Sequence, residues 1–177
     1  MILEQEFIQE LHTILQKQTS ILLFEDYKLQ NYVRTHMVVD QEFFLPKNAV
    51  NSVIKLQSVR EVWIALCIDK ALHAYMFNHA SKDLFIPESE RPAYMDDFAA
   101  EFENLIVGHT LSFIRHNDNR IGTPKIRVSE AAIHQIANVN IHLSEIHTNK
   151  GLARLYSIVP ARYYNQNLET IKETHHV

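Results

Sequence analysis

Near the start of the chain, large hydrophobic residues recur at the three- and four-residue spacing of an amphipathic helix. The residues with this spacing are Leu3, Phe7, Leu11, Ile14 and Leu15. Because a helix advances about 100° per residue, these side chains share one face. The pattern predicts a helix that ends near Gln18 and packs on a sheet or on a neighbouring helix.

The composition changes between Ile21 and Leu45, where aromatic and β-branched residues stand among polar ones. This mixture favours strands or irregular extended segments. Two β-rich runs follow, Val50–Leu56 and Val59–Ile68, and they are divided by Gln57 and Ser58. Alternation of apolar and polar residues inside both runs predicts a β-hairpin.

Two helices are expected next. The first runs from about Lys70 to Ala80, and prolines punctuate the polar loop after it. The second begins beyond Pro92 and runs from about Tyr94 to Arg115 without an internal proline. Its apolar face is predicted to consist of Phe98, Phe102, Leu105, His109 and Phe113.

Three further strands are expected at Lys125–Ile136, Asn138–Glu145 and Leu152–Val159, and Asn149-Lys150-Gly151 has the chemistry of a hairpin turn. The sequence therefore predicts an α+β fold in which long helices pack on a mixed β-sheet. We expect one domain over residues 1–163 and a polar C-terminal tail over residues 164–177.

The composition is that of an ordinary folded domain, with 177 residues of which 46% are hydrophobic and 21% are charged. A net charge of −4 gives no general attraction to nucleic acid or to anionic lipid, so neither is expected as a partner. The chain shows no export signal and no apolar window long enough to cross a bilayer, so a cytoplasmic location is expected. Cys67 is the only cysteine and lies in an apolar run, which favours a buried, unreactive thiol.

A polar stripe runs along the second of the two central helices. It consists of Asp97, Glu101, Asn104 and Gly108, which fall within a sector of roughly 60°. In one interpretation the polar residues only solvate an exposed face and Gly108 allows close packing. However, Asn and Gly cost about 0.7 and 1 kcal/mol relative to Ala inside a helix. A surface on which another macromolecule docks closely would account for both residues.

At these positions the sequence resembles the CheC/CheX family of chemotaxis phosphatases, whose motif helix reads D-x-x-x-E-x-x-N-x-x-x-G. The segments Val53–Leu56 and Val62–Leu66 are similar to the CheX hairpin that precedes this helix. Only one E-x-x-N is present, which resembles the single-motif CheX rather than CheC with its two copies. Glu103, next to Asn104, departs from the pattern and is expected to add negative charge to the docking surface.

The resemblance implies a CheX-like fold and a phosphatase that hydrolyses the aspartyl phosphate of a phosphorylated CheY-like receiver domain. Asn104 would orient the attacking water, since a carboxamide donates and accepts hydrogen bonds without ionising. Glu101 would pair with the receiver's active-site lysine, and Asp97 and Gly108 would shape the docking helix. The chain would need no cofactor of its own, because the Mg²⁺ ion belongs to the receiver. The resemblance also suggests a homodimer.

Two alternatives remain. The protein is either such a phosphatase or a non-catalytic module of the same fold that docks a receiver or another signalling protein. A metal site is a weaker hypothesis: His142, Glu145 and His147 form the nearest cluster, followed by His73 and His79. None of these matches a known ligand spacing, and on a strand His142 and His147 point to opposite faces. We therefore predict no bound metal.

Overall fold

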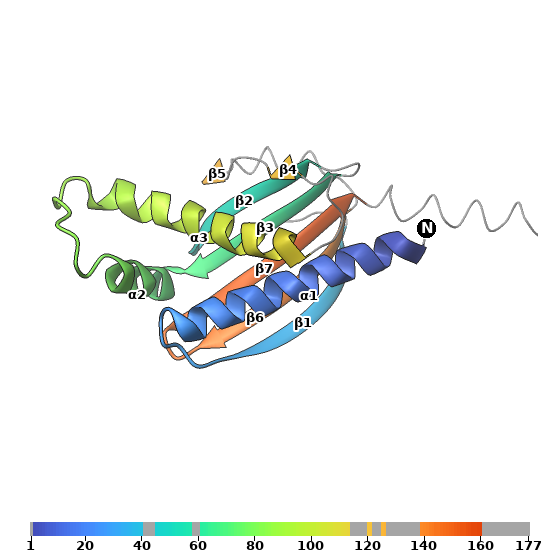
Figure 1. Ribbon diagram of the computed structural model, residues 1–177, viewed down its shortest axis with the longest axis horizontal. Coiled ribbons are helices and arrows are strands. Elements are labelled where there is room, and N and C mark those ends of the chain that lie inside the picture. The colour runs from blue at the N-terminus through green and yellow to red at the C-terminus, as the bar shows by residue number, and fades with distance from the viewer. Residues whose placement is uncertain are drawn as a thin grey trace, which may run out of the picture.

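The computed structural model describes residues 2–40, 45–57, 61–113, 120–121, 125–126 and 139–160, and these form helices packed on one β-sheet (Figure 1). The elements, in chain order, are α1 (Ile2–Glu25), β1 (Asn31–Asp40), β2 (Ala49–Gln57), β3 (Glu61–Asp69), α2 (Lys70–Ala80), α3 (Arg91–Phe113), β4 (Arg120–Ile121), β5 (Lys125–Ile126), β6 (Val139–Thr148) and β7 (Gly151–Pro160). The α+β fold class is thus confirmed.

The long strands lie in the order β1-β6-β7-β3-β2, and the short strands β4 and β5 both pair with β2. Every described pairing is antiparallel, so the expectation of a mixed sheet was wrong in that respect. The two hairpins, β2–β3 and β6–β7, explain much of this arrangement, because antiparallel neighbours need only a short turn between them. The predicted hairpin of the two central β-rich runs is confirmed.

The β6–β7 turn consists of Asn149 and Lys150, and Gly151 is the first residue of β7. Gly151 has φ of 141°, a backbone conformation that side chains rarely permit. A Cβ atom there would also lie 3.1 Å from the Cβ of Leu72 at the start of α2. The glycine therefore lets this hairpin approach α2 closely.

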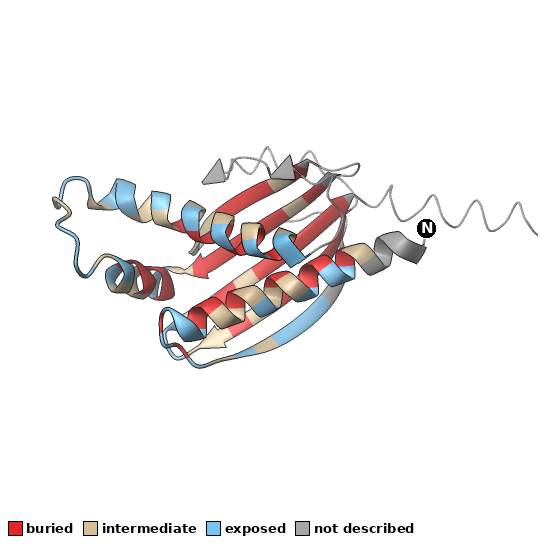
Figure 2. Ribbon diagram, viewed as in Figure 1, coloured by how far each residue is buried: buried red, intermediate tan, exposed pale blue. Residues whose placement is uncertain are grey.

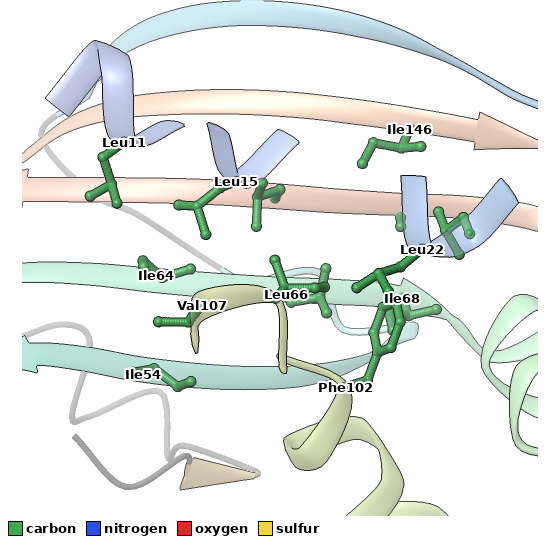
Figure 3. Close-up of a cluster of buried hydrophobic side chains, with 14 of the residues drawn as sticks. Leu11, Leu15, Leu22, Ile54, Ile64, Leu66, Ile68, Phe102, Val107 and Ile146 are labelled. Carbon is green, nitrogen blue, oxygen red and sulfur yellow. The ribbon is translucent and has the colours of Figure 1, made fainter. Parts of the chain in front are cut away.

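The helices cover one face of the sheet, with α1 and α3 lying side by side across it (Figure 1). Between them and the sheet lies the larger apolar core, where side chains of α1 and α3 meet those of the central strands (Figure 3). The side chains that Figure 3 labels in this core are Leu11, Leu15, Leu22, Ile54, Ile64, Leu66, Ile68, Phe102, Val107 and Ile146. Buried positions follow the strands beneath both helices (Figure 2).

Two helix boundaries differ from the prediction. Helix α1 continues beyond Gln18 to Glu25, because Leu22 and Leu23 extend the buried face and are themselves in the core. Helix α3 begins at Arg91 rather than after Pro92, since a proline in the first turn costs no intrahelical hydrogen bond. Helix α2 has the bounds that the sequence predicted.

The opposite face of the sheet carries a second, smaller apolar cluster that includes Val53, Cys67 and Ile141. Cys67 is fully buried, which confirms the expectation of a buried thiol, and this burial raises the pKa of the thiol. No helix in the described ranges is long and apolar enough to cross a membrane. The predicted strand beyond Ile126 and the predicted tail at residues 164–177 lie outside the described residues.

Candidate functional site

The polar stripe lies on the side of α3 that faces away from the sheet. Asp97 and Glu101 are exposed, while Asn104 and Gly108 are half-buried. Within the described part of the chain, the side chains of Asp97, Glu101 and Asn104 form no hydrogen bond and no ion pair. Nothing in the described part of the chain therefore occupies the polar groups of these three side chains.

Gly108 has no packing role among the residues that the structure describes. A Cβ atom built on it would meet no atom within 4 Å. The hypothesis that this glycine allows close internal packing is therefore wrong. A glycine inside a helix is unfavourable unless something requires the missing side chain. No such requirement is found among the described residues, since the space over Gly108 is open.

We expect Gly108→Ala to stabilise the protein by about 0.5–1 kcal/mol, because alanine restricts the unfolded chain and meets nothing in the folded one. Thermal unfolding of both forms measures this difference. A loss of stability would show that the glycine is needed within the fold. If the stripe is a docking surface, the same variant should bind its partner more weakly.

The buried face of α3 is rotated by about a quarter turn from the predicted one. Its buried residues are Ala99, Phe102, Glu103, Ile106, Val107 and Thr110. Phe102 was placed correctly and Phe98 is half-buried against the core, but Leu105 is 43% exposed and Phe113 is 61% exposed. His109 is also exposed. The rotation arises because α3 packs against α1 as well as β2. Leu105 consequently lies beside Glu101 and Gly108 on the outer surface.

Glu103 is the clearest correction, because it does not add charge to the docking surface. Its side chain is 1% exposed and accepts a hydrogen bond from Ser52 Oγ of β2. Burial raises the pKa of Glu103 to about 8, although Ser52 and the backbone of Leu66 favour the charged form. The other carboxyl oxygen, Oε1, has no hydrogen-bond partner among the described residues.

Of the predicted cluster, the structure brings only Glu145 and His147 together, with His147 Nε2 3.8 Å from Glu145 Oε2, and it leaves His142 on the other face of the sheet. His142 lies with its ring centroid 5.6 Å from that of His12 on α1, whereas His147 stacks at 4.7 Å on Tyr32 on the opposite face of the sheet. Glu145 is 3.4 Å from Arg154 Nε, an ion pair that opposes cation binding. In the part of the chain that the structure describes, no group of three His, Cys, Asp or Glu side chains is placed to hold a metal.

The remaining two histidine candidates lie among aromatic rings near α2. His73 is buried, and its ring centroid lies 5.7 Å from that of Phe98. The ring centroid of His79 lies 5.8 Å from that of Tyr27. Burial lowers the pKa of His73, which favours the neutral form. Both residues pack between elements of the fold and stand apart from the stripe.

Sequence reasoning missed a buried polar cluster beneath α1. His12 Nδ1 lies 2.8 Å from Ser157 Oγ of β7, and Nε2 lies 2.9 Å from Ser144 Oγ of β6. The three side chains are almost fully buried, and burial lowers the pKa of His12 to about 4. A histidine and serines in contact resemble a nucleophilic pair, but no substrate reaches them. The cluster joins α1 to two strands, and no sequence pattern predicted it, because His12 lies about 100° around the helix from Leu11 and outside the predicted apolar face.

No protein-family model and no curated protein matches this sequence. The fold, however, is similar to that of solved chemotaxis proteins. CheX from Desulfovibrio desulfuricans matches with a TM-score of 0.62 and 14% identity, over 84% of this chain and 97% of that one. A CheC-like superfamily protein from Shewanella matches with a TM-score of 0.63 and 15% identity, over 84% of this chain and 96% of that one.

A third similar structure is CheX from Borrelia burgdorferi, solved in a complex with CheY, BeF₃ and Mg²⁺. It matches with a TM-score of 0.61 and 12% identity, over 83% of this chain and 95% of that one. The chain therefore has the CheX/CheC-like fold, which confirms the resemblance seen in the motif helix and the hairpin. Within that fold, α3 is the helix that carries Glu101 and Asn104.

Proposed function

We propose that this protein is a CheX-like phosphatase that hydrolyses the aspartyl phosphate of a phosphorylated CheY-like receiver domain in the cytoplasm. The observation that carries the proposal is the outer face of α3. There, the side chains of Glu101 and Asn104 have no polar partner among the described residues, and nothing in those residues lies within 4 Å of a Cβ atom built on Gly108. The fold supports it as well, because one similar structure is a CheX in complex with CheY.

In this proposal Asn104 performs the chemical task. Its carboxamide holds a water molecule in line with the P–O bond of the aspartyl phosphate, because the amide both donates and accepts hydrogen bonds. Docking fixes the positions of the water and the phosphate before the reaction. The entropy of ordering them is then lost on binding and no longer adds to the activation barrier. The phosphate and the Mg²⁺ ion belong to the receiver, so the chain itself brings no cofactor. Half-burial of Asn104 limits its side-chain freedom and helps this orientation.

Glu101 is the docking residue. Its exposed carboxylate lies one turn from Asn104, so a lysine of the receiver that pairs with it would set the register of the complex. Leu105 adds an exposed apolar side chain beside it. Asp97 and Gly108 complete the helix face, the first by extending its negative charge and the second by leaving room for close approach.

The direct test is decay of receiver phosphorylation with and without the protein. We expect faster decay in its presence. The two function classes separate in the same assay, because a non-catalytic docking module would bind the beryllofluoride-bound receiver without accelerating decay. If the protein neither binds nor accelerates decay, the outer face of α3 serves another purpose and the proposal is wrong.

Glu101→Ala is expected to weaken binding of the beryllofluoride-bound receiver about tenfold, because it removes one partner of a charge pair at the interface. Titration calorimetry measures the affinity. Asp97→Ala, four residues away on the same exposed face, is the matched control and should change the affinity much less. Equal losses in both variants would indicate general charge attraction in place of a specific pair.

We also propose a homodimer built across strand edges. Strand β1 lies at one edge of the sheet and pairs only with β6 among the described strands. An unpaired edge offers backbone donors and acceptors to a second copy. Light scattering should therefore give a mass of about twice 20.7 kDa. A monomer at high protein concentration would contradict this prediction.

A further inference from the structure

One side chain of α3 links the motif helix to the sheet by a directional contact. Glu103 reaches from the buried face of α3 to Ser52 Oγ in β2. Its buried neighbours on the same face are apolar, apart from Thr110, whose hydroxyl group donates to Ile106 O within the helix at 2.8 Å. Apolar contacts allow a helix to slide or rotate slightly, whereas a hydrogen bond fixes one position.

Stability alone does not explain a glutamate at this position. The carboxyl group is almost completely buried, and one of its oxygens has no hydrogen-bond partner among the described residues. Burying such a group is unfavourable. Leucine has a similar helix propensity and would pack beside Phe102 and Ile106 without that cost. A buried polar contact that costs stability is expected where it fixes something that the apolar core leaves loose.

The residue that follows Glu103 in the chain is Asn104. If α3 rotated about its axis, Asn104 would turn through the same angle as Glu103. The contact between Glu103 and Ser52 opposes this rotation. Ser52 itself is held within the sheet, where it is paired with Leu66 of β3 on one side and with Ile126 of β5 on the other. The anchor is therefore a residue whose strand is paired on both sides at this position.

We infer that Glu103 is a positioning residue, which fixes the rotation of α3 on β2 through Ser52 and thereby holds Asn104 in its working orientation. This inference rests on the proposed function. A displacement of about 1 Å at a reacting group is enough to lower a rate by roughly 100-fold. A single hydrogen bond next to Asn104 can therefore matter for turnover even though it makes no contact with the receiver.

The test compares Glu103→Leu, Glu103→Gln and Ser52→Ala with Thr110→Val, a control that removes the other buried hydrogen bond of the same helix face. We expect Glu103→Leu to melt at a higher temperature than the wild type but to turn over receiver phosphate about tenfold or more slowly. Affinity for the beryllofluoride-bound receiver should fall less than turnover, since Glu101 turns with the helix but keeps its charge, and charge attraction depends less steeply on position than the alignment of the water. Glu103→Gln keeps an acceptor for Ser52 and should retain the rate, while Thr110→Val should leave it unchanged.

A second measurement addresses position without activity. Residual dipolar couplings of backbone amides should show α3 reoriented relative to β2 in Glu103→Leu and in Ser52→Ala, but not in Glu103→Gln. A Glu103→Leu protein with unchanged turnover and an unmoved α3 would overturn the inference. If the wild-type protein fails to accelerate receiver decay, the proposed function fails, and the dipolar couplings alone decide whether Glu103 positions the helix. If Glu103→Leu does not fold, Ser52→Ala and Glu103→Gln supply the same comparison.

Discussion

Asn104→Ala is expected to lower the rate of receiver dephosphorylation by about 100-fold or more while receiver binding changes by less than about twofold. The reason is that the carboxamide acts on the water molecule in the transition state and contributes little to the docked ground state. Loss of kcat with an unchanged KM is the kinetic form of that difference. The measurement is decay of the phosphorylated receiver, followed in parallel with affinity for its beryllofluoride-bound form.

The stability of the same variant provides the control. Asn104 is half-buried without a hydrogen-bond partner among the described residues, so its removal should not destabilise the protein. Alanine is also the better helix former by about 0.7 kcal/mol, which favours a slightly higher melting temperature. A lower melting temperature with unchanged activity would mean that Asn104 has a structural role. Asn104→Asp keeps the shape of the side chain but adds a charge, and should be as inactive as alanine because it repels the phosphate.

Local patterns predicted the elements well. The bounds of α2 follow from residues that are all close in sequence, and so does the β2–β3 hairpin. The placement of β1 and β3 beside β6 and β7 was not accessible in the same way, because those pairings join residues far apart in the chain. The end of α1 was missed because Leu22 and Leu23 were assigned to an extended segment, and only packing on the sheet makes them part of a helix.

For the site, the sequence predicted that Glu101 and Asn104 lie on an exposed face, because helical spacing alone determines which residues share a face. Glu101 is exposed as predicted, whereas Asn104 is half-buried. It did not predict which neighbouring arc of α3 is buried. Two arcs contain enough apolar residues, one with Leu105 and Phe113 and one with Ile106 and Val107. The choice is made by α1 and β2, which pack against the second arc. Glu103 was therefore assigned to the surface. Its contact with Ser52 could not be predicted, because the two residues are 51 positions apart in the chain.

A fall in pH is expected to destabilise the protein through His12. The folded-state pKa of His12 is lowered from 6.5 to about 4, mainly by burial and also by His142 nearby. The folded state thus binds fewer protons than the unfolded state between these values, so unfolding becomes easier as the pH falls below 6.5. At 1.36 kcal/mol per pH unit, the loss reaches about 3 kcal/mol near pH 4. Lowered pKa values of His73 and His142 act in the same direction.

Glu103 acts in the opposite direction over part of this range. Its pKa is raised from 4.5 to about 8, so the folded state binds more protons than the unfolded state between these values. Stability from this group is complete below pH 4.5 and is lost as the pH rises through 8. The wild-type protein should therefore gain stability as the pH falls from 8 to 6.5. Below pH 6.5, Glu103 continues to stabilise the protein as the pH falls, while the histidines destabilise it. The Glu103→Gln variant should lack the gain above pH 6.5.

The contribution of His12 is isolated by comparison with His12→Gln, measured by denaturant unfolding at pH 7 and at pH 4. Glutamine can still meet Ser144 and Ser157 but does not titrate, so the other ionisable groups cancel in the difference. We expect the stability of the wild type to fall relative to this variant by about 3 kcal/mol between the two pH values. The same substitution at the exposed His109 controls for loss of a histidine from the surface. A difference that stays constant with pH would mean that His12 has the same pKa in the folded and unfolded states, so that burial does not lower it.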